Sequence, residues 1–375
     1  METELHFFPS IAAIDRAAWD ALFPNEIETW DYYRAIEDAG LPGFDWRYVT
    51  VWHGDMLVAA APAFVTDYRL DTTIVGPLKR WTERLARLLP RLMSIRMLCL
   101  GSPVSEICHA GTPPGTTPEQ RYALLARLLD GLQEVAARER IGLIAVKDTP
   151  MDSILSEVCW AAQYTRLPGM PIAALSLDFA DLDGYLKKLS RVTRKDMKRK
   201  LRDAAAVRVE ARANIDDVLP QVMALYESTW QRSDLRLEHL TPEYFTAVLR
   251  HMAGRATCFL YWEGERLAAF NLVLHDERRM IDKFFGTDNQ PRRINLYHLS
   301  WLENVRHCLE RYLAVFQAGQ AFYAEKVRLG SRLEGNWQFF SHRSRPIDFL
   351  LRLVSRVVRL DRIDPEIRVL MARHK

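Results

Sequence analysis

The chain has 375 residues, of which 49% are hydrophobic and 26% are charged, a composition typical of a folded protein of about two domains. Its formal net charge of +3 is too small to indicate a nucleic-acid-binding protein by itself. Its five cysteines are scattered and form no Cys-x-x-Cys pair, which argues against a disulfide framework and against a structural zinc site.

The N-terminus and the hydropathy pattern indicate a cytoplasmic protein. The first residues, Met1-Glu-Thr-Glu-Leu, lack the basic region and the apolar core of a secretion signal. No run of residues approaches the roughly 18 apolar positions of a membrane span. The scattered cysteines also fit a reducing compartment.

Two similar hairpin patterns occur along the chain, over residues 47–65 and 257–274. Five positions of the first recur in the second at one constant offset: Trp52, Gly54, Asp55, Leu57 and Ala59 match Trp262, Gly264, Glu265, Leu267 and Ala269. The glycine falls at the turn, where a positive φ is cheapest for this residue. We interpret the repeat as an internal duplication; the alternative is a hairpin pattern common to many α/β proteins.

The elements around the two hairpins also correspond. Helical patterns precede each hairpin, and a helix and a strand follow it. In chain order these are helices 11–22 and 27–39, helix 117–138 and strand 142–146 in the first half, and helices 215–231 and 241–252, helix 294–311 and strand 312–317 in the second. This order predicts an α/β fold with two mixed sheets. We expect domains at 1–178 and 179–345, followed by a helical tail at 346–375.

A helix predicted over residues 183–206 carries the main charge run of the chain. Its basic residues are Lys187, Lys188, Arg191, Arg194, Lys195, Lys198, Arg199, Lys200 and Arg202. Leucine and methionine recur at helical intervals among them, so one edge can pack while the rest stays cationic. Such a surface suits the phosphates of coenzyme A, a nucleotide-sugar diphosphate or a tRNA backbone. The alternative is a solvated helix face.

The segment 312–330 is the strongest candidate for an active edge. A short apolar strand runs into Gly319 and is followed by closely spaced polar groups: Gln320, Tyr323, Glu325, Lys326 and Arg328. Ligand sites of α/β folds lie at such strand ends. If the chain turns helical there, Tyr323 and Lys326 share one face. The alternative is a strand that simply leaves the core into a charged loop.

Two other groups of side chains carry weaker signals. Cys108 and His109 place a thiol beside an imidazole, but adjacent positions do not provide the geometry of a Cys-His nucleophile. His298, Glu303 and His307 follow one another at spacings of five and four, unlike a zinc-binding His-Glu-x-x-His helix. We expect no metal site. The tail after Pro346 is apolar with regularly spaced arginines, which indicates a helix packed on the domain or, alternatively, a peripheral contact with an acidic membrane.

The order of a basic helix, a hairpin, a long helix and a strand followed by Gly319, Tyr323 and Lys326 resembles the GNAT-related acyltransferases grouped with the cellulose-biosynthesis acetyltransferases. It is also similar to the Fem-type ligases that add amino acids to peptidoglycan precursors. A relative concerned with peptidoglycan biosynthesis or recognition has a glycine, a lysine and a later Ser-x-His, compatible with Gly319, Lys326 and Ser341-His342. The resemblance in motifs covers residues 179–345. In the first half of the chain only the order of the predicted helices and strands is similar.

This resemblance implies tandem GNAT-like (acyl-CoA N-acyltransferase) domains, each a mixed twisted sheet flanked by helices. It implies an N-acyltransferase that uses acetyl-CoA or another acyl-CoA and an amine of a small molecule or a cell-envelope precursor, by direct attack. The implied catalytic residues are Tyr323, Glu325 and His298, and the implied substrate-binding residues are Gln320, Lys326 and Arg328. The implied cofactor-binding residues are Arg292, Arg293, Asn295, Arg194 and Lys198.

Two positions depart from the GNAT pattern. The stretch Gln290–Asn295 has no glycine where the pyrophosphate usually meets bare backbone, and Gln317 stands near the place of an expected aspartate. Two alternatives therefore remain. One is an aminoacyl-tRNA-dependent Fem-like ligase, favoured by the basic helix but without an inserted coiled-coil arm. The other is a non-catalytic binding protein on a degenerate GNAT fold. DNA is not an expected partner.

Overall fold

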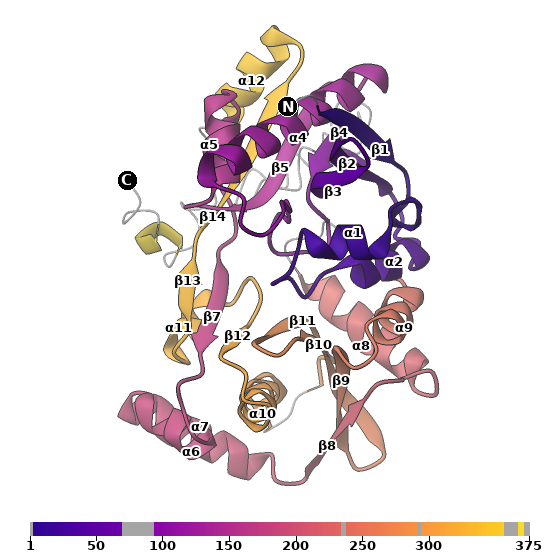
Figure 1. Ribbon diagram of the computed structural model, residues 1–375. Coiled ribbons are helices and arrows are strands. Elements are labelled where there is room, and N and C mark those ends of the chain that lie inside the picture. Colours follow the sequence, from indigo (N-terminus) through magenta and orange to yellow (C-terminus); the bar gives the residue numbers. More distant parts are fainter. Residues whose placement is uncertain (1–2, 70–93, 234–237, 291–293, 356–366, 371–375) are drawn as a thin grey trace. The chain divides into compact units, whose positions relative to one another are not determined.

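The computed structural model describes residues 3–69, 94–233, 238–290, 294–355 and 367–370 (Figure 1). The chain divides into two compact units. The first consists of Met1–Glu37, Leu41–Pro171 and Gly335–Lys375, and the second of Asp38–Gly40 and Ile172–Glu334. Each unit is built around its own seven-stranded sheet.

The sheet of the first unit has the order β1-β2-β3-β4-β5-β14-β6, in which β4 and β5 are parallel and the other neighbours antiparallel. Its strands are β1 (Glu4–Phe8), β2 (Asp45–His53), β3 (Met56–Arg69), β4 (Ser94–Leu100), β5 (Leu143–Pro150), β14 (Asn336–His342) and β6 (Thr165–Pro168). Its helices are η1 (Ile11–Ala13), α1 (Arg16–Ala21), α2 (Trp30–Asp38), α4 (Pro118–Arg138), α5 (Ile154–Ala161) and α12 (Arg345–Ser355).

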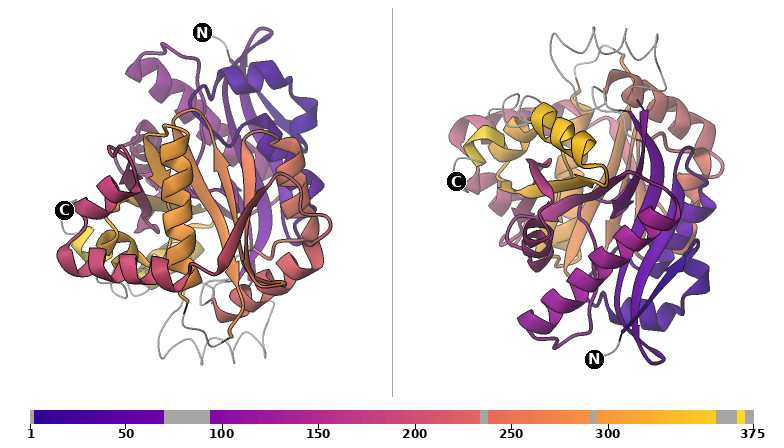
Figure 2. Two further views of the ribbon diagram at one scale, coloured as in Figure 1. Left: turned by 90° about the horizontal axis from the view of Figure 1, so that it is seen from below. Right: turned by 90° about the horizontal axis from the view of Figure 1, so that it is seen from above.

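The sheet of the second unit has the order β13-β7-β12-β11-β10-β9-β8, in which only β11 and β12 are parallel. Its strands are β13 (Arg332–Glu334), β7 (Ile172–Ser176), β12 (Val315–Gln317), β11 (Arg279–Thr287), β10 (Arg266–His275), β9 (Ala256–Glu263) and β8 (Val207–Arg212). Its helices are α6 (Leu182–Lys188), α7 (Arg191–Asp203), α8 (Leu219–Arg232), α9 (Pro242–His251), α10 (Leu296–Glu310) and α11 (Tyr323–Arg328). Figure 2 shows α10 lying across one face of this sheet.

The predicted fold class, two mixed sheets with flanking helices, is confirmed. In each unit a hairpin (β2–β3 or β9–β10) leads to a strand that a helical crossover joins to a parallel neighbour. The hairpin turns have matching glycines, Gly54 at φ 58° and Gly264 at φ 61°. The strand register also shifts at the same place in both hairpins. In the first, Trp52 pairs with Leu57 and Val51 with Ala59, so the residue at 58 is skipped. In the second, the corresponding pairs are 262 with 267 and 261 with 269, so the residue at 268 is skipped. The repeat therefore extends to a shared β-bulge.

The expected domain limits differ from this division at two strands. β7 precedes residue 178 but pairs with β12 and β13 in the second sheet. β14 follows the second unit and pairs between β5 and β6 in the first, so Ser341 and His342 lie in the first sheet. The pairing of β14 supplies hydrogen-bond partners to both neighbours that would otherwise form open edges.

The basic segment forms two helices where the sequence predicts one. Leu189 at the end of α6 has an extended backbone, and Ser190 caps α7, its hydroxyl accepting a hydrogen bond from the Thr193 N–H at 3.2 Å. Serine favours this N-cap role because its oxygen replaces a missing helical acceptor. The break lets α6 and α7 each bury a separate face, with Tyr185 and Met197 in the core.

In the tail, which is predicted to be helical over 346–375, α12 is an amphipathic helix that ends at Ser355. Leu351 packs against the core of the first unit. The apolar residues that point away from the core are exposed: Ile347, Phe349, Leu350, Leu353 and Val354. The arginines at 356 and 359 lie outside the described residues, and a membrane contact of this tail stays a prediction. No helix in the described ranges combines the length and apolar character needed to cross a bilayer.

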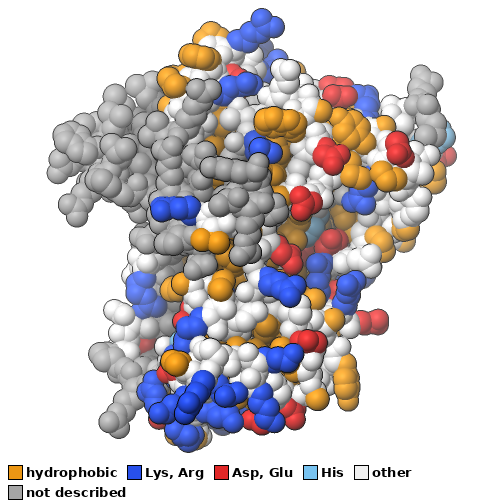
Figure 3. All heavy atoms as spheres, turned by 90° about the vertical axis from the view of Figure 1, so that its left-hand side faces the viewer, with side chains coloured by type: hydrophobic (Ala, Val, Ile, Leu, Met, Phe, Trp, Pro, Cys, Tyr) orange, Lys and Arg blue, Asp and Glu red, His pale blue; other side chains and the backbone are white. Residues whose placement is uncertain are grey.

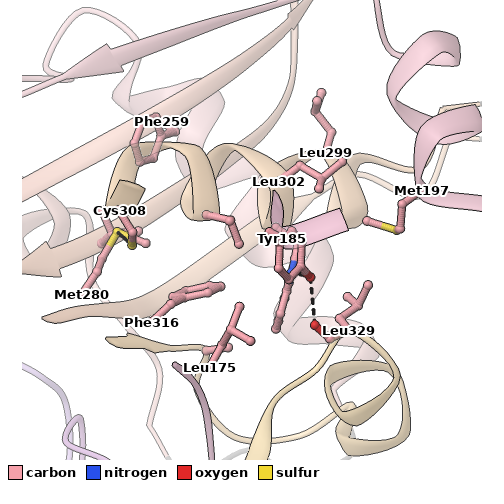
Figure 4. Close-up of a cluster of buried hydrophobic side chains, with 14 of the residues drawn as sticks. Leu175, Tyr185, Met197, Phe259, Met280, Leu299, Leu302, Cys308, Phe316 and Leu329 are labelled. Carbon is pink, nitrogen blue, oxygen red and sulfur yellow. Dashed lines mark hydrogen bonds between the residues drawn. The ribbon is translucent and has the colours of Figure 1, made fainter. Parts of the chain in front are cut away.

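The core of the second unit contains a buried hydrogen-bond relay, of which Figure 4 shows the bond between Tyr185 and Leu329. The indole N–H of Trp301 on α10 donates to the hydroxyl of Tyr185 on α6 at 2.8 Å. That hydroxyl donates to the carbonyl of Leu329, directly after α11, also at 2.8 Å. All three residues are almost fully buried. The relay therefore links α6, α10 and the end of α11 through polar groups that are too deeply buried to form hydrogen bonds with water.

Replacing Tyr185 by phenylalanine leaves the Trp301 N–H and the Leu329 carbonyl buried without this partner. We expect the free energy of unfolding to fall by about 2 kcal/mol, because an unsatisfied buried polar group costs about 1–3 kcal/mol. Denaturant-induced unfolding of the variant measures this. The matched control is Tyr312→Phe, since Tyr312 is 92% exposed and should change stability little. Equal stability of the two variants contradicts the role of the relay.

Candidate active site

In the second unit, the parallel strands β11 and β12 separate after a short ladder. They pair only from Arg279 with Val315 to Ile281 with Gln317. Strand β11 continues for six more residues to Thr287, paired on its other side with β10, while no described strand accompanies it on the β12 side. This fork provides a strand edge along which an extended ligand can lie.

Asp282 is the first residue of β11 beyond the ladder. Its carboxylate accepts hydrogen bonds from the side-chain amides of Asn271 at 2.6 Å and Asn304 at 3.4 Å. Both asparagines are fully buried, and the hydroxyl of Ser300 donates to Asn271 at 3.3 Å. A register shift in β10 and β11 occurs beside Asp282, with Lys283 as the additional residue. Such bulges commonly aim a side chain at a functional site.

A charged cluster lies where α7, α10 and α11 meet, and it consists of Asp196, Lys200, His298, Glu325 and Arg328. The imidazole Nε2 of His298 contacts the Glu325 carboxylate and lies 3.0 Å from the Lys200 ammonium. The Arg328 guanidinium pairs with Glu325 and lies 3.3 Å from both Nε2 and the Asp196 carboxylate. The Lys200–Asp196 ion pair, at 2.9 Å, completes the cluster. Two predicted catalytic residues, distant in sequence, are thus in contact.

The N-termini of α10 and α11 position the side chains of His298 and Glu325. The Asn295 side chain caps α10 by accepting from the His298 N–H at 3.1 Å, so this predicted cofactor residue has a structural role. Before α11, Ala321 and Phe322 have φ values of 66° and 53°. Left-handed backbone costs a non-glycine residue on the order of 1–2 kcal/mol, and such strain concentrates at functional sites. The two residues turn the chain sharply from the end of β12 into the helix that carries Glu325.

The cluster keeps its imidazole neutral. Burial lowers the pKa of His298, and the positive charges of Lys200 and Arg328 lower it further, against the opposing effect of Glu325. Hydrogen bonding from Arg328 lowers the pKa of Glu325 despite partial burial. Burial opposes ionisation of Asp196, but hydrogen bonds from Lys200 and neighbouring arginines hold its pKa well below the usual range. A neutral imidazole beside an ionised carboxylate is suited to accept a proton.

The other predicted site residues that the structure describes have partners of their own. Tyr323 and Lys326 are both buried on α11, with exposed fractions of 2% and 4%. The Lys326 ammonium donates to the backbone carbonyl of Gln320 at 3.0 Å. On α7, Arg194 donates to the carbonyl of Lys187, and Lys198 pairs with Asp183 at the surface. The two arginines predicted to bind the cofactor, Arg292 and Arg293, lie outside the described residues.

Sequence analysis did not single out Asp282, Lys200 or Asp196. Asp282 had a local signal, since together with Lys283 it interrupts an apolar run between Met280-Ile281 and Phe284-Phe285. Lys200 had none, because it resembles the other cations of its helix, whereas Asp196 differs from them as the single acid of the basic run. Only the packing of α7 against α10 shows which of these charges face inward.

The first unit lacks the fork in its described part. There β4 ends at Leu100, where its ladder with β5 also ends. The chain that follows remains attached to β5, since the Cys108 N–H donates to the Asp148 carbonyl at 2.9 Å. Burial raises the pKa of the Cys108 thiol well above its usual value, which disfavours a thiolate nucleophile. Across the described ranges no three His, Cys, Asp or Glu side chains are placed to hold a metal ion.

Comparison with known proteins identifies a family match within the second unit. Residues 191–327 match the model of the acetyltransferase (GNAT) domain. Over 329 residues the chain is 21% identical to the putative 8-amino-7-oxononanoate synthase 2 of two Mycobacterium tuberculosis strains, covering 85% of this chain. It spans 42% of the length of those curated relatives.

Solved structures show the same fold. FemX superposes with a TM-score of 0.61 at 13% identity, over 94% of this chain and 100% of FemX. A tandem GNAT protein from the clavulanic acid biosynthesis pathway gives 0.54 at 15% identity, over 90% and 98% of the two chains. The chain therefore has a tandem GNAT-like fold and carries an acyltransferase domain of GNAT type.

The contacts of His298 predict opposite pKa shifts in two variants. Lys200→Gln removes a charge that lowers the pKa of His298, so the pKa should rise. Glu325→Gln removes a partner that raises it, so the pKa should fall. Titration of the histidine ring signals by NMR measures both, with His298→Asn to assign the resonance. Lys187→Gln, at an exposed position, is the control and should cause no shift; shifts of one sign in both variants contradict the described cluster.

Proposed function

We propose that the chain is an N-acyltransferase that transfers an acyl group from an acyl-CoA to an amine by direct attack. The contact between His298 and Glu325, beside the fork of a GNAT-type domain, is the observation that supports it most. Tyr297, next to His298, stacks edge-on against Phe285 of β11 at 5.9 Å between ring centroids. This contact supports the proposal, because it joins the residue before His298 to β11, the strand along which an extended donor would lie.

The donor would use the fork and the start of α10. Backbone N–H groups at a helix N-terminus favour phosphate. Helix α10 begins at Leu296, three residues after Arg293, which together with Arg292 is predicted to bind the cofactor. Lys198 and Arg194 on α7 supply further positive charge. Acyl-CoA brings a thioester whose carbonyl carbon is open to attack by an amine. Charge from arginine would replace the bare glycine backbone that Gln290–Asn295 lacks.

The transfer requires an unprotonated amine. In our proposal neutral His298, oriented by Glu325, takes the amine proton as nitrogen attacks the thioester carbonyl. The C–S bond then breaks and the thiolate leaves with a proton, for which buried Tyr323 is the proposed donor. No covalent enzyme intermediate forms, and much of the rate gain comes from holding the reactants together. Lys326 and Arg328 are proposed to favour an acidic group on the acceptor, such as that of a cell-envelope precursor.

A second candidate is an aminoacyl-tRNA-dependent ligase of the Fem type. The superposition on FemX over 94% of the chain and the basic helix α7 favour it. A third, a non-catalytic binding protein, is favoured by the absence of glycine in Gln290–Asn295. These candidates share the fold and differ in the ligand that the second unit binds.

Binding of the donor separates the candidates. A ligand that binds only the folded protein raises the free energy of unfolding by mass action, by about 2.7 kcal/mol at a ligand concentration of 100 Kd. The melting temperature rises with it. We expect stabilisation by acetyl-CoA or a longer acyl-CoA and none by coenzyme-free buffer or charged tRNA. Thermal unfolding with each ligand measures this. Stabilisation by charged tRNA alone supports the second candidate, and no stabilisation by any of them supports the third.

Catalysis is tested by three substitutions in an enzyme with an identified donor and acceptor. His298→Ala, Glu325→Gln and Tyr323→Phe should lower kcat, His298→Ala by about 10²–10⁴-fold, the usual contribution of general acid–base catalysis. Release of free thiol follows the reaction. His239→Ala is the matched control, because His239 is an exposed histidine paired with Glu227. Unchanged turnover in both His298→Ala and Tyr323→Phe removes the assignment.

A further inference from the structure

The outer face of α7 carries a row of positive charges. Arg191, Lys195, Lys198 and Arg202 follow one another at intervals of four, three and four residues, so they lie on one side of the helix. All four are exposed. The eleven residue-to-residue steps from Arg191 to Arg202 span about 16 Å of helix, the length of this row. We call these four residues the cationic stripe.

The stripe is opposite to the side of α7 that the protein uses. Thr193 and Met197 are buried, and Lys200 contributes to the charged cluster. Only Lys198 of the stripe has an acidic partner, Asp183, in an exposed pair. In the described part of the chain, Arg191, Lys195 and Arg202 form no ion pair. Like charges one helical turn apart repel, so an external anion would relieve an unfavourable arrangement.

The charge distribution of the whole chain is strongly asymmetric. Residues 182–203, which form α6 and α7, contain nine Lys and Arg against three Asp and Glu, a net charge of +6. The net charge of the full chain is +3, so the rest carries −3. A negative surface therefore attracts this segment and repels the remainder, which orients the protein during approach. Figure 3 shows the gathering of Lys and Arg side chains over this segment, at the foot of the view.

We propose that the cationic stripe docks the protein on an anionic lipid bilayer. A straight row on an outward helix face can meet a plane of phosphates with all four side chains at once. Groups of four to eight Lys and Arg on an amphipathic helix are typical of binding to anionic lipids. Val192, 78% exposed beside the stripe, is compatible with the interfacial region. Lys198 is also a proposed donor-binding residue, whereas Arg191, Lys195 and Arg202 have no part in the proposed acyl transfer, and docking does not depend on that reaction.

RNA is the competing polyanion, and α7 fits it less well. Recognition of single-stranded RNA uses aromatic side chains that stack on bases and polar groups that reach base edges. No aromatic or amide side chain occurs among Arg191–Asp203, and the single hydroxyl, that of Thr193, is buried. The exposed face offers positive charge and the aliphatic Val192, which suits a lipid surface that has no bases to recognise.

The test compares flotation of the full chain with two kinds of vesicle. One kind is phosphatidylcholine alone, and the other contains phosphatidylglycerol as well. We expect binding only to the second kind and its loss at high salt, because screening weakens exposed charge interactions. The triple variant Arg191→Gln, Lys195→Gln, Arg202→Gln should bind on the order of 100-fold more weakly, from about 1 kcal/mol for each residue. It leaves Lys198 and the charged cluster intact.

The matched control removes three exposed arginines elsewhere, Arg121, Arg250 and Arg278, each by substitution with glutamine. Both triple variants bring the net charge from +3 to zero, so a difference between them reports position and not total charge. Thermal unfolding shows whether the variants remain folded. The proposal is overturned by equal vesicle binding of the two variants, by binding that ignores lipid charge, or by stripe-dependent binding to RNA without binding to vesicles.

Discussion

The hydrogen bond from Trp301 to Tyr185, continued to the carbonyl of Leu329, is the interaction on which the site depends. It joins elements that are far apart in sequence, since Tyr185 and Leu329 are separated by 144 residues. Water is excluded from the relay, so each polar group has its best partner only when α6, α10 and the end of α11 are in register. The charged cluster is assembled from α7, α10 and α11. Helix α7 follows α6 directly in the chain, α10 carries Trp301, and Leu329 follows the end of α11. The buried core therefore holds in register the helices that carry the partly buried ion pairs of the cluster.

The charges of the cluster explain why a neutral imidazole is favoured. Asp196 and Glu325 supply two negative charges, and Lys200 and Arg328 supply two positive charges. Protonation of His298 would add an uncompensated charge in a partly buried place, which desolvation disfavours. The pair of cations thus balances the carboxylates and at the same time leaves the imidazole able to accept a proton. A simple His–Glu pair would instead favour the imidazolium.

The sequence contains much of the local structure and little of the long-range arrangement. The hairpin repeat was predictable because Gly54 and Gly264 sit at turns that need positive φ, and the same spacing preserved the bulge. The contact of His298 with Glu325 was not derivable, although both residues were candidates, because it depends on where α11 packs. The return of β14 to the first sheet was invisible for the same reason. The break before Ser190 was readable in hindsight as an N-cap, but the continuous basic run obscured it.

The two units share a fold but differ at the place that matters for chemistry. In the first, the Lys147 ammonium donates to the carbonyls of Ser102 and Ser105 at 2.8 and 2.7 Å, which binds the segment after β4 to β5. In the second, β11 runs past the end of its ladder with β12, and Asp282 stands at the opening. Closing a strand edge with the chain's own backbone satisfies its polar groups, whereas an open edge requires another partner. A ligand that lies along the strand supplies such a partner. One unit thus closes this strand edge with its own backbone, whereas β11 of the other has, among the described residues, no strand neighbour beyond Ile281 on the β12 side.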